Sequence, residues 1–252
     1  MVKVTAALRS RDDWTQEETA THYREHHGAL VASSSDFTRY LRKYVQNYVI
    51  RSEDPIFADQ RHDRAFVTQV WFPSLADMKA AFADPQAKYI RADERRFANF
   101  DGMVRHYGSE YELFDGDRAD DAKAIIRRPR INLLVFRSRR SDLDQVAFQQ
   151  YWRNERAGEL VGHPLFQRYV RRYVQTHANE GGKSVLDIGS SDVIDEFSFA
   201  TRADATAFWT GYRGAAEIGA VDKAMTDAET SWFLLTESRV VCAELIEWAA
   251  PQ

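Results

Sequence analysis

The 252-residue chain has little of what defines several common classes of protein. Its one cysteine, Cys242, allows no disulfide within the chain, which fits a reducing cytoplasm. No apolar run approaches the roughly 20 residues that a membrane helix needs. The formal net charge of −4 and the pI of about 6.0 exclude the basic surface expected of a nucleic-acid-binding protein. We therefore expect a cytoplasmic protein without nucleic-acid or membrane partners.

Motifs for nucleotides, metals and nucleophilic catalysis are also missing. The pair Gly181 and Gly182 has neither the P-loop spacing nor the dinucleotide glycine pattern. His22 and His26 stand four residues apart, which suits two metal ligands, but no third ligand is placed to complete a site. No nucleophile-elbow motif occurs. We expect no cofactor and no metal.

A ten-residue segment occurs twice in the chain. Residues 37–46 read FTRYLRKYVQ and residues 166–175 read FQRYVRRYVQ, with seven identical positions. The offset is 129 residues, which is about half of the chain and far longer than the repeats of solenoid proteins. The chain is therefore one structural unit written twice, and the differences between the two copies are informative about function.

The same order of elements is predicted in both copies. β-prone runs recur in register along the two halves, and so do helix starts with capping-box spacing, which are Thr15 with Glu18, Asp142 with Gln145, Ser74 with Asp77 and Thr201 with Asp204. The expected elements follow in chain order, with copy one given before copy two. They are first strands at 2–8 and 131–136, first helices ending near 31 and 161, second strands at 38–49 and 167–177, third strands at 65–72 and 193–199, second helices starting near 74 and 201, and last strands near 104–113 and 232–241. Each half thus reads βαββαβ, with a split βαβ character.

Such a sheet has helices on one face and leaves the other face bare. A bare apolar face must be buried, and the second copy is the obvious partner. We therefore expect an α+β fold in which the two sheets pack face to face as a barrel with the helices outside. The predicted division is a first unit at 1–114, a charged linker at 115–129 and a second unit at 130–252.

The first helix of copy one holds the main candidate for proton transfer. Tyr23, His27 and Leu30 share one stripe of this helix, which puts His27 toward the sheet. An imidazole there could move protons near neutral pH. The alternative is a packed histidine that only hydrogen bonds to the sheet. The matching residue of copy two is Arg156, whose guanidinium does not deprotonate in proteins and cannot replace a proton shuttle.

The repeated strand predicts a row of polar side chains on one face. The row in each copy follows from alternation along the strand, and it consists of Tyr40, Arg42, Tyr44, Gln46 and Tyr48 in copy one and of Tyr169, Arg171, Tyr173, Gln175 and His177 in copy two. Such side chains can line a pocket for a small oxygenated ligand. They can equally be amphipathic residues that seal the contact between the sheets.

Two segments of each copy resemble the EthD family. HYREHHGALV followed by RYLRKYVQNYV, and FQQYWRNERAGELV followed by RYVRRYVQTH, are similar to its helix and strand motifs. The resemblance implies the dimeric α/β-barrel superfamily with ferredoxin-like units, here fused in one chain. It places the helix histidine of the family on His27 and its strand histidine on His177, where copy one has Tyr48. Arg156 departs from the family pattern.

The resemblance and the residues together suggest a function. The leading hypothesis is a cofactor-independent lyase, isomerase or cyclase of the polyketide-cyclase kind, acting by general acid–base chemistry on a small oxygenated aromatic or polyketide-like compound. His27 would transfer the proton, and Tyr40 and Tyr44 would hold a carbonyl or phenol oxygen. The substrate-binding candidates are Tyr23, Arg24, Gln46, Tyr48, Trp71, Tyr173 and His177.

Two other functions stay open at this point. One is a non-catalytic protein that binds a small molecule, and the other is a cofactor-free or heme-assisted monooxygenase. The fused units make a partner chain unnecessary but leave a homodimer open.

Overall fold

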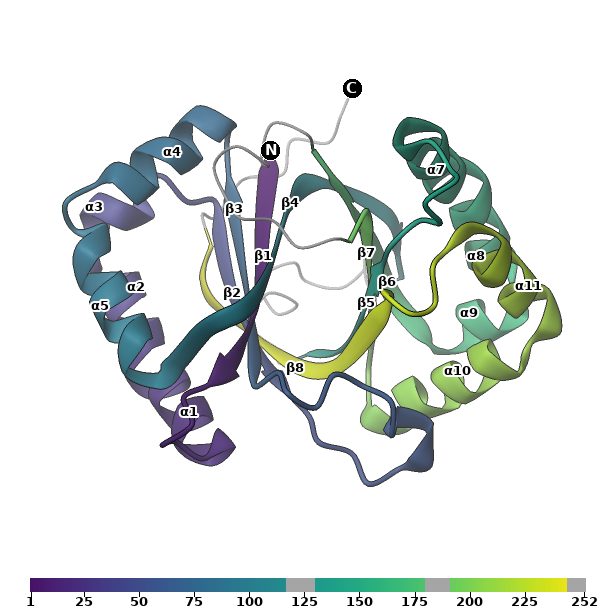
Figure 1. The fold of residues 1–252 in the computed structure, drawn as a ribbon, viewed down its shortest axis with the longest axis horizontal. Coiled ribbons are helices and arrows are strands. Elements are labelled where there is room, and N and C mark those ends of the chain that lie inside the picture. The colour runs from purple at the N-terminus through teal and green to yellow at the C-terminus, as the bar shows by residue number, and fades with distance from the viewer. Residues whose placement is uncertain (117–129, 180–190, 244–252) are drawn as a thin grey trace.

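A computed structural model describes residues 1–116, 130–179 and 191–243 of the chain (Figure 1). In this described part, antiparallel strands close into one barrel in the order β1-β3-β2-β8-β5-β7-β6-β4. The strands are β1 (Val2–Ser10), β2 (Lys43–Val49), β3 (Phe66–Phe72), β4 (Ala98–Asp115), β5 (Arg130–Arg137), β6 (Val170–Ala178), β7 (Val193–Phe199) and β8 (Trp232–Ala243). The predicted last strands thus start earlier than expected in copy one and end later in copy two.

The barrel is built from two units with the same internal strand order. The first unit runs β4-β1-β3-β2 and the second runs β8-β5-β7-β6, so each is a ferredoxin-like sheet. The units join where β2 pairs with β8 and where β4 pairs with β6. The predicted α+β fold of two fused units is confirmed, and hydrogen bonds between the edge strands make the two sheets a single closed wall. Most of the predicted linker, from residue 117 to 129, and the pair Gly181 and Gly182 lie outside the described residues.

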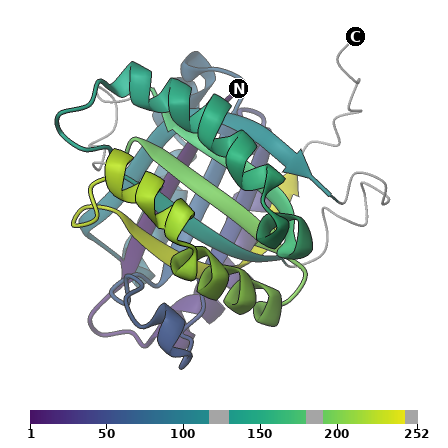
Figure 2. The ribbon, with the colours of Figure 1, turned by 90° about the vertical axis from the view of Figure 1, so that its right-hand side faces the viewer.

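Helices cover the barrel on two opposite sides (Figure 1). Figure 2 shows those of the second unit lying across the outer face of its strands. The first unit has α1 (Gln16–His22), η1 (Tyr23–His27), α2 (Gly28–Ser33), α3 (Ser35–Thr38), η2 (Pro55–Phe57), α4 (Leu75–Ala83) and α5 (Ala87–Phe97). The second has α7 (Gln145–Tyr151), η3 (Trp152–Arg156), α8 (Ala157–Gly162), α9 (Pro164–Tyr169), α10 (Arg202–Gly214) and α11 (Ala216–Met225).

The helix starts follow the predicted capping residues at three of four places. Thr15 forms a capping box with Glu18, and Ser74 and Thr201 accept hydrogen bonds from backbone N–H groups three residues later. The prediction of a cap at Asp142 was wrong, because Asp144 is the residue that caps α7. Asp142 instead pairs with Arg140 in the preceding turn.

The repeated strand starts later than the sequence pattern predicts. Residues 38–42 and 167–169 are not strand, because short helices α3 and α9 precede β2 and β6. Phe37 and Phe166 are the cause, since both are buried as helix residues against the outer face of the sheet. Tyr40 consequently lies in the turn before β2 rather than on the strand.

The two faces of β2 have different neighbours. Tyr44, Gln46 and Tyr48 face the helices, where Gln46 donates a hydrogen bond to the backbone of η1. Lys43 and Asn47 face the inside of the barrel. The polar row therefore does not seal the contact between the two sheets; it forms the floor beneath the helices.

One wide helical turn recurs at the same place in both units. In η1 the N–H of Gly28 bonds to the carbonyl of Tyr23 five residues back, and in η3 Ala157 does the same with Trp152. Such π-turns are rare in proteins overall, but those that occur are often found at functional sites. A strand glutamine supports each turn, since the Gln46 side chain donates to the Tyr23 carbonyl at 2.5 Å. A Cβ on Gly28 would lie 3.1 Å from that amide nitrogen, so glycine permits this close approach.

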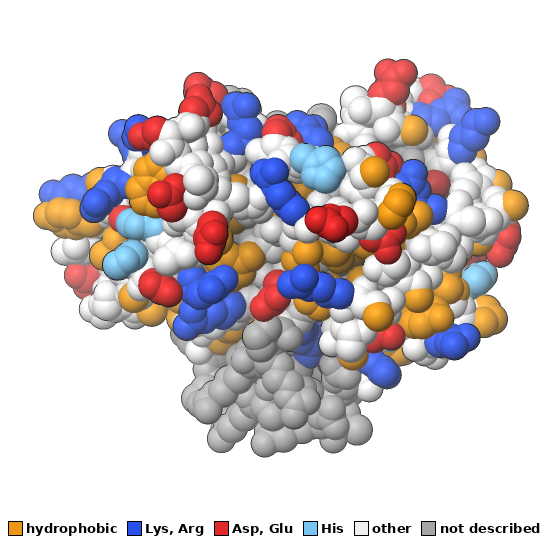
Figure 3. All heavy atoms as spheres, turned by 90° about the horizontal axis from the view of Figure 1, so that it is seen from below, with side chains coloured by type: hydrophobic (Ala, Val, Ile, Leu, Met, Phe, Trp, Pro, Cys, Tyr) orange, Lys and Arg blue, Asp and Glu red, His pale blue; other side chains and the backbone are white. Residues whose placement is uncertain are grey.

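The surface carries charges of both signs. Acidic and basic side chains are interspersed over the face shown in Figure 3. No helix in the described part of the chain is long and apolar enough to cross a membrane.

The glutamine beneath η3 should contribute strongly to stability. Gln175 is fully buried, donates to the Trp152 carbonyl at 3.1 Å and to the Tyr173 hydroxyl at 2.6 Å, and accepts from His177 at 2.8 Å. Gln175→Ala should lower the free energy of unfolding by about 2–4 kcal/mol, because several buried polar groups lose their partner. Urea unfolding measures this, with the exposed Gln167→Ala as control. A loss below about 1 kcal/mol would show that the turn does not depend on the glutamine.

Candidate functional site

His27 lies on η1, buried between the helices and the sheet. Its side chain is 3% exposed, and its Nδ1 donates to Asp93 Oδ2 at 2.9 Å. Its Nε2 lies 3.8 Å from Glu94 Oε1. Asp93 and Glu94 are consecutive residues of α5, so both ring nitrogens of His27 face carboxylates from the second helix layer.

Asp93 joins two imidazoles. Its Oδ1 accepts a hydrogen bond from His22 Nε2 at 2.9 Å, while Oδ2 accepts from His27. Burial alone would raise the pKa of Asp93, but the hydrogen bonds from His27 and His22 outweigh it and lower that pKa. Burial raises the pKa of Glu94 in spite of the opposing effect of His27. A hydrogen-bonded chain thus runs from His22 through Asp93 to His27.

Aromatic side chains close the space around His27. Tyr23 stacks on it at 5.8 Å between ring centroids, and Phe97 lies at 5.3 Å. A hollow of about 430 Å³ lies on the far side of Asp93, lined by Trp14, Glu17, Glu18, Thr21, His22 and His26. That hollow meets His22 and not His27.

Several of the predicted site residues come together beneath η1. Gln46 donates to the Tyr44 hydroxyl at 3.3 Å and accepts from the Tyr48 hydroxyl at 2.5 Å. The Tyr23 hydroxyl pairs with Thr68 at 2.7 Å. Burial raises the pKa of Tyr23, Tyr44 and Tyr48, so these phenols are protonated at neutral pH.

Of the remaining predicted residues of the first unit, Arg24 contacts this group from the surface, whereas Tyr40 and Trp71 lie apart from it. Arg24 is exposed and stacks on the Tyr48 ring at 4.9 Å. Tyr40 lies in the turn before β2 and accepts from Arg39 at 2.9 Å. Trp71 faces the inside of the barrel, where its indole N–H donates to Glu110 at 3.0 Å. The sequence could not place Trp71, because alternation does not say which face of a strand meets the helices.

The second unit repeats the same frame with different groups. Asp222 stands 129 positions after Asp93, and its Oδ1 accepts from Arg156 at 2.8 Å, as Asp93 does from His27. Tyr173, the counterpart of Tyr44, donates to Asp195 at 2.8 Å. Both units thus pair a nitrogen-bearing side chain on the π-turn with a carboxylate on the last helix, but the second unit has a guanidinium where the first has an imidazole.

His177 replaces Tyr48 without changing the hydrogen bond that it makes. Its Nε2 donates to the Gln175 side chain at 2.8 Å, as the Tyr48 hydroxyl donates to Gln46. Burial, followed by the charge of Arg153, lowers the pKa of His177 to about 3. His177 is therefore neutral near pH 7 and is held as a hydrogen-bond donor.

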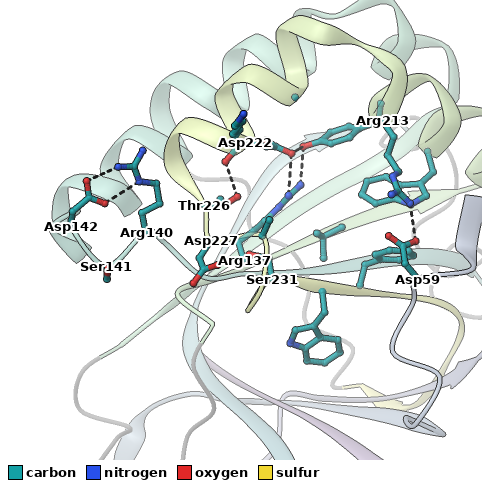
Figure 4. A pocket seen from close by; sticks show the side chains of 18 residues that line it. Asp59, Arg137, Arg140, Ser141, Asp142, Arg213, Asp222, Thr226, Asp227 and Ser231 are labelled. Atoms are coloured by element: carbon teal, nitrogen blue, oxygen red, sulfur yellow. Dashed lines mark hydrogen bonds and ion pairs between the residues drawn. The ribbon is translucent and has the colours of Figure 1, made fainter.

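A large pocket opens in the second unit, between α10, α11 and the ends of β5 and β8 (Figure 4). Its volume is about 980 Å³. We call it the C-terminal pocket, and its lining comprises Asp59, Val135, Arg137, Arg140, Ser141, Asp142, Trp209, Tyr212, Arg213, Gly219, Asp222, Lys223, Thr226, Asp227, Ala228, Ser231, Trp232 and Phe233. The sequence prediction did not include this site.

The inner wall of the C-terminal pocket is a saturated network. Arg137 donates to Asp195 at 3.1 Å, to Asp222 at 3.1 Å and to the Tyr212 hydroxyl at 2.8 Å. Tyr212 in turn donates to Asp222 at 2.9 Å. Burial raises the pKa of Tyr212 although Arg137 opposes it, so the phenol keeps its proton. Arg137 and Tyr212 hydrogen bond to each other and to the carboxylates of this wall, so none of these carboxylates is free to act as a base.

Two replacements distinguish the second unit from the first at the C-terminal pocket. Leu8 and Phe97 pack with Tyr23 in an apolar cluster of the first unit. The residues 129 positions later are Arg137 and Thr226, so a charged side chain and a small one stand where the first unit has two apolar ones. Comparison of the two copies at this offset is the sequence signal that could have found the pocket.

The C-terminal pocket does not fit a heme iron. Histidine, cysteine and methionine, three common axial ligands, do not occur in its lining. The hydroxyl of Tyr212 is held by Arg137 and Asp222. In the part of the chain that the structure describes, no group of three or more potential metal ligands occurs.

The carboxylate of Asp93 should make stability depend on pH in acid. Its pKa is lowered in the folded state, so its contribution is complete above the unfolded value of about 3.9 and is lost as the pH falls through the folded value. The gap in free energy of unfolding between the wild type and Asp93→Asn should therefore shrink below about pH 4. Urea unfolding from pH 7 to pH 3 measures it, with the exposed Asp12→Asn as control. A constant gap would contradict the assignment.

Two solved structures with a TM-score above 0.5 are similar in fold to this chain. A monooxygenase candidate from Lactobacillus acidophilus NCFM has a TM-score of 0.51 and 7% identity, with 96% of this chain and 94% of that chain covered. The chlorite dismutase candidate TA0507 has a TM-score of 0.52 and 12% identity, with 96% and 95% covered. An EthD family protein from Bacillus halodurans C-125 has a TM-score of 0.34 and 18% identity, with 44% and 99% covered.

At such low identity the first two structures show the fold alone. No curated protein matches the chain. Residues 11–101 match the EthD domain family, and this segment contains η1, β2 and α5 and hence His27 and Asp93. This match confirms, for a segment within the first unit, the resemblance found in the sequence.

Proposed function

We propose that the protein binds an uncharged, oxygenated aromatic compound in the C-terminal pocket. One observation carries this proposal. Trp209 lines the pocket and is 5% exposed, yet its indole N–H has no hydrogen-bond partner among the described residues. A buried donor without an acceptor costs about 1–3 kcal/mol, which a ligand oxygen would recover.

The rest of the lining defines the class of ligand. Trp209, Tyr212, Trp232 and Phe233 supply aromatic surface, which suits a flat apolar body. The lining holds four basic side chains, on Arg137, Arg140, Arg213 and Lys223, and four acidic ones. Arg140 pairs with Asp142, and Arg213 with Asp59, as Figure 4 shows. Since the charges balance, the pocket favours a ligand without net charge.

Binding is better supported here than proton transfer. The ionisable groups at the inner wall are Arg137, Tyr212 and Asp222, and each is hydrogen-bonded to another member of the set. Two guanidinium groups occupy the carboxylate of Asp222, and the raised pKa of Tyr212 keeps the proton on its phenol. This favours the binding alternative over the lyase hypothesis for the C-terminal pocket.

The indole of Trp209 should discriminate between ligands with and without oxygen. Trp209→Phe should weaken binding of 1-naphthol roughly tenfold, because it removes one hydrogen-bond donor but keeps an aromatic ring. Binding of naphthalene should change less than about twofold. Isothermal titration calorimetry measures both.

Trp14→Phe is the matched control, because Trp14 lies beside His22 on the other side of the barrel. An unchanged affinity of Trp209→Phe for 1-naphthol would refute the assigned donor. A loss in Trp14→Phe instead would place binding at the hollow next to His22, and a preference for 1-naphthoate would refute the uncharged ligand.

A second candidate function is general acid–base chemistry at His27, as in a lyase or isomerase. The observation that favours it is the chain from His22 through Asp93 to His27, within the segment that matches the EthD domain. Asp93 would hold one tautomer of His27, which leaves Nε2 to exchange a proton with a carbon acid. Glu94 lies 3.8 Å from Nε2, so its side chain would have to give way to the substrate.

Proton exchange on an enolisable ketone tests this second function. The wild type should speed deuterium exchange next to the carbonyl of 1-tetralone, as followed by NMR, and His27→Gln should lose at least about 100-fold of that rate. The exposed neighbour in His26→Gln should keep it. Equal rates in wild type and His27→Gln would exclude His27 as the proton carrier.

A further inference from the structure

Three arginine side chains lie near one another where β1 ends and β3 begins, at the lower end of the barrel in Figure 1. The Ala65 N–H donates to the Leu8 carbonyl at 2.9 Å, which holds the chain just before β3 against β1. We call the group the arginine corner, and it consists of Arg9 in β1 and of Arg61 and Arg64 in the segment before β3. None of the three lines the C-terminal pocket or the hollow beside His22.

Arg64 is a buried cation with too few partners. Its side chain is 3% exposed, yet its Nε and Nη1 have no hydrogen-bond partner among the described residues. Its Nη2 lies 3.5 Å from Asp63 Oδ2, which is longer than an ordinary hydrogen bond. Burying a charged group without hydrogen bonds is unfavourable, so the guanidinium of Arg64 gains free energy from any further anionic acceptor that reaches it.

The charges of the arginine corner do not balance. Among the described residues, Asp63 is the only carboxylate within 4.0 Å of these arginines, and Arg61 and Arg64 share it. Arg9 donates instead to the backbone carbonyl of Asp101, and its Nε has no partner in the described part of the chain. Burial lowers the pKa of Arg64 although Asp63 opposes it, and the charges of Arg61 and Arg9 add to the effect of burial. Three cations against one carboxylate leave an excess of two positive charges.

We propose that the arginine corner binds a doubly charged tetrahedral oxyanion, such as the phosphate group of a small phosphorylated compound. Guanidinium groups suit such oxyanions, because their N–H groups are held in one plane and reach two oxygens at once. Two negative charges would offset the excess of two positive charges at this corner.

Asp63 marks the side from which the anion would enter. Its side chain is 43% exposed and that of Arg61 is 42% exposed, so both border the solvent. The Nη1 and Nη2 groups of a guanidinium point the same way and can bind two oxygens of one anion. On Arg64, Asp63 holds Nη2 only at 3.5 Å. Rotation of the exposed Asp63 side chain away from Arg64 would give an anion access to both groups.

Calorimetric titration with inorganic phosphate tests the proposal on the intact protein. At about pH 8 most of the phosphate is doubly charged, and sodium chloride keeps the ionic strength constant. The wild type should bind phosphate saturably. Arg64→Met should weaken binding at least about tenfold, because it removes the charged hydrogen-bond donors but keeps a long side chain. Asp63→Asn should strengthen binding about threefold, because it removes the competing negative charge and keeps Arg64.

Arg11→Met is the matched control. Arg11 is an exposed arginine whose guanidinium Asp13 already holds at 2.7 Å, so this variant should bind phosphate as the wild type does. Sulfate should bind about as well as phosphate, since it has the same shape and charge. Acetate, which carries one charge, should bind at least several times more weakly.

Each outcome decides one part of the proposal. Absence of saturable binding by the wild type would overturn it as a whole. An unchanged affinity in Arg64→Met, or an equal loss in Arg11→Met, would overturn the assigned position. Should Arg64→Met fail to fold, Asp63→Asn decides the position, and an affinity no higher than that of the wild type would refute it. Equal affinities for acetate and sulfate would overturn the requirement for two negative charges.

Discussion

The closure of the barrel across its two seams is the constraint on which the rest of the structure depends. Each unit alone would leave two strand edges with unpaired backbone groups, and β2–β8 and β4–β6 pairing removes all four edges at once. Closure also fixes where chemistry can occur. The helices must cover the outer face on two opposite sides, and the inner face encloses an interior that is filled with side chains. The chain therefore has three separate environments for functional groups, two of them related by the duplication.

The two outer environments share a frame and differ in what the frame holds. In both units a strand glutamine supports a π-turn, and a carboxylate of the last helix accepts a hydrogen bond from the side chain that ends this turn, His27 or Arg156. The first unit uses this frame to hold an imidazole among aromatic rings. The second uses it to anchor a guanidinium network, and the loss of apolar bulk at Arg137 and Thr226 opens the space beside it. The shared hydrogen bonds stabilise both units. The positions that differ between the units determine whether the space between helices and sheet is filled or forms a pocket.

Local signals in the sequence predicted the order of elements well, because capping pairs and alternation act over a few residues. The start of β2 could not be predicted in this way, since Phe37 is helical only because the sheet beneath buries it. The cluster of Tyr23, Tyr44, Gln46 and Tyr48 followed from alternation and the helix stripe together. The position of Trp71 could not be predicted in this way, because the second unit determines which face of β3 points into the barrel interior. The C-terminal pocket depends on packing over long sequence distances, and its signal in the sequence is the replacement of Leu8 and Phe97 by Arg137 and Thr226 in the second copy.

Fusion of the two units has a consequence that a pair of identical chains could not have. In a symmetric dimer of identical chains, every substitution appears in both subunits, so a side chain that suits one subunit must also be present in the other. Here position 48 is tyrosine and its counterpart at 177 is histidine, with the same hydrogen bond preserved in both. Covalent linkage thus lets the two halves carry different side chains at equivalent positions of one barrel.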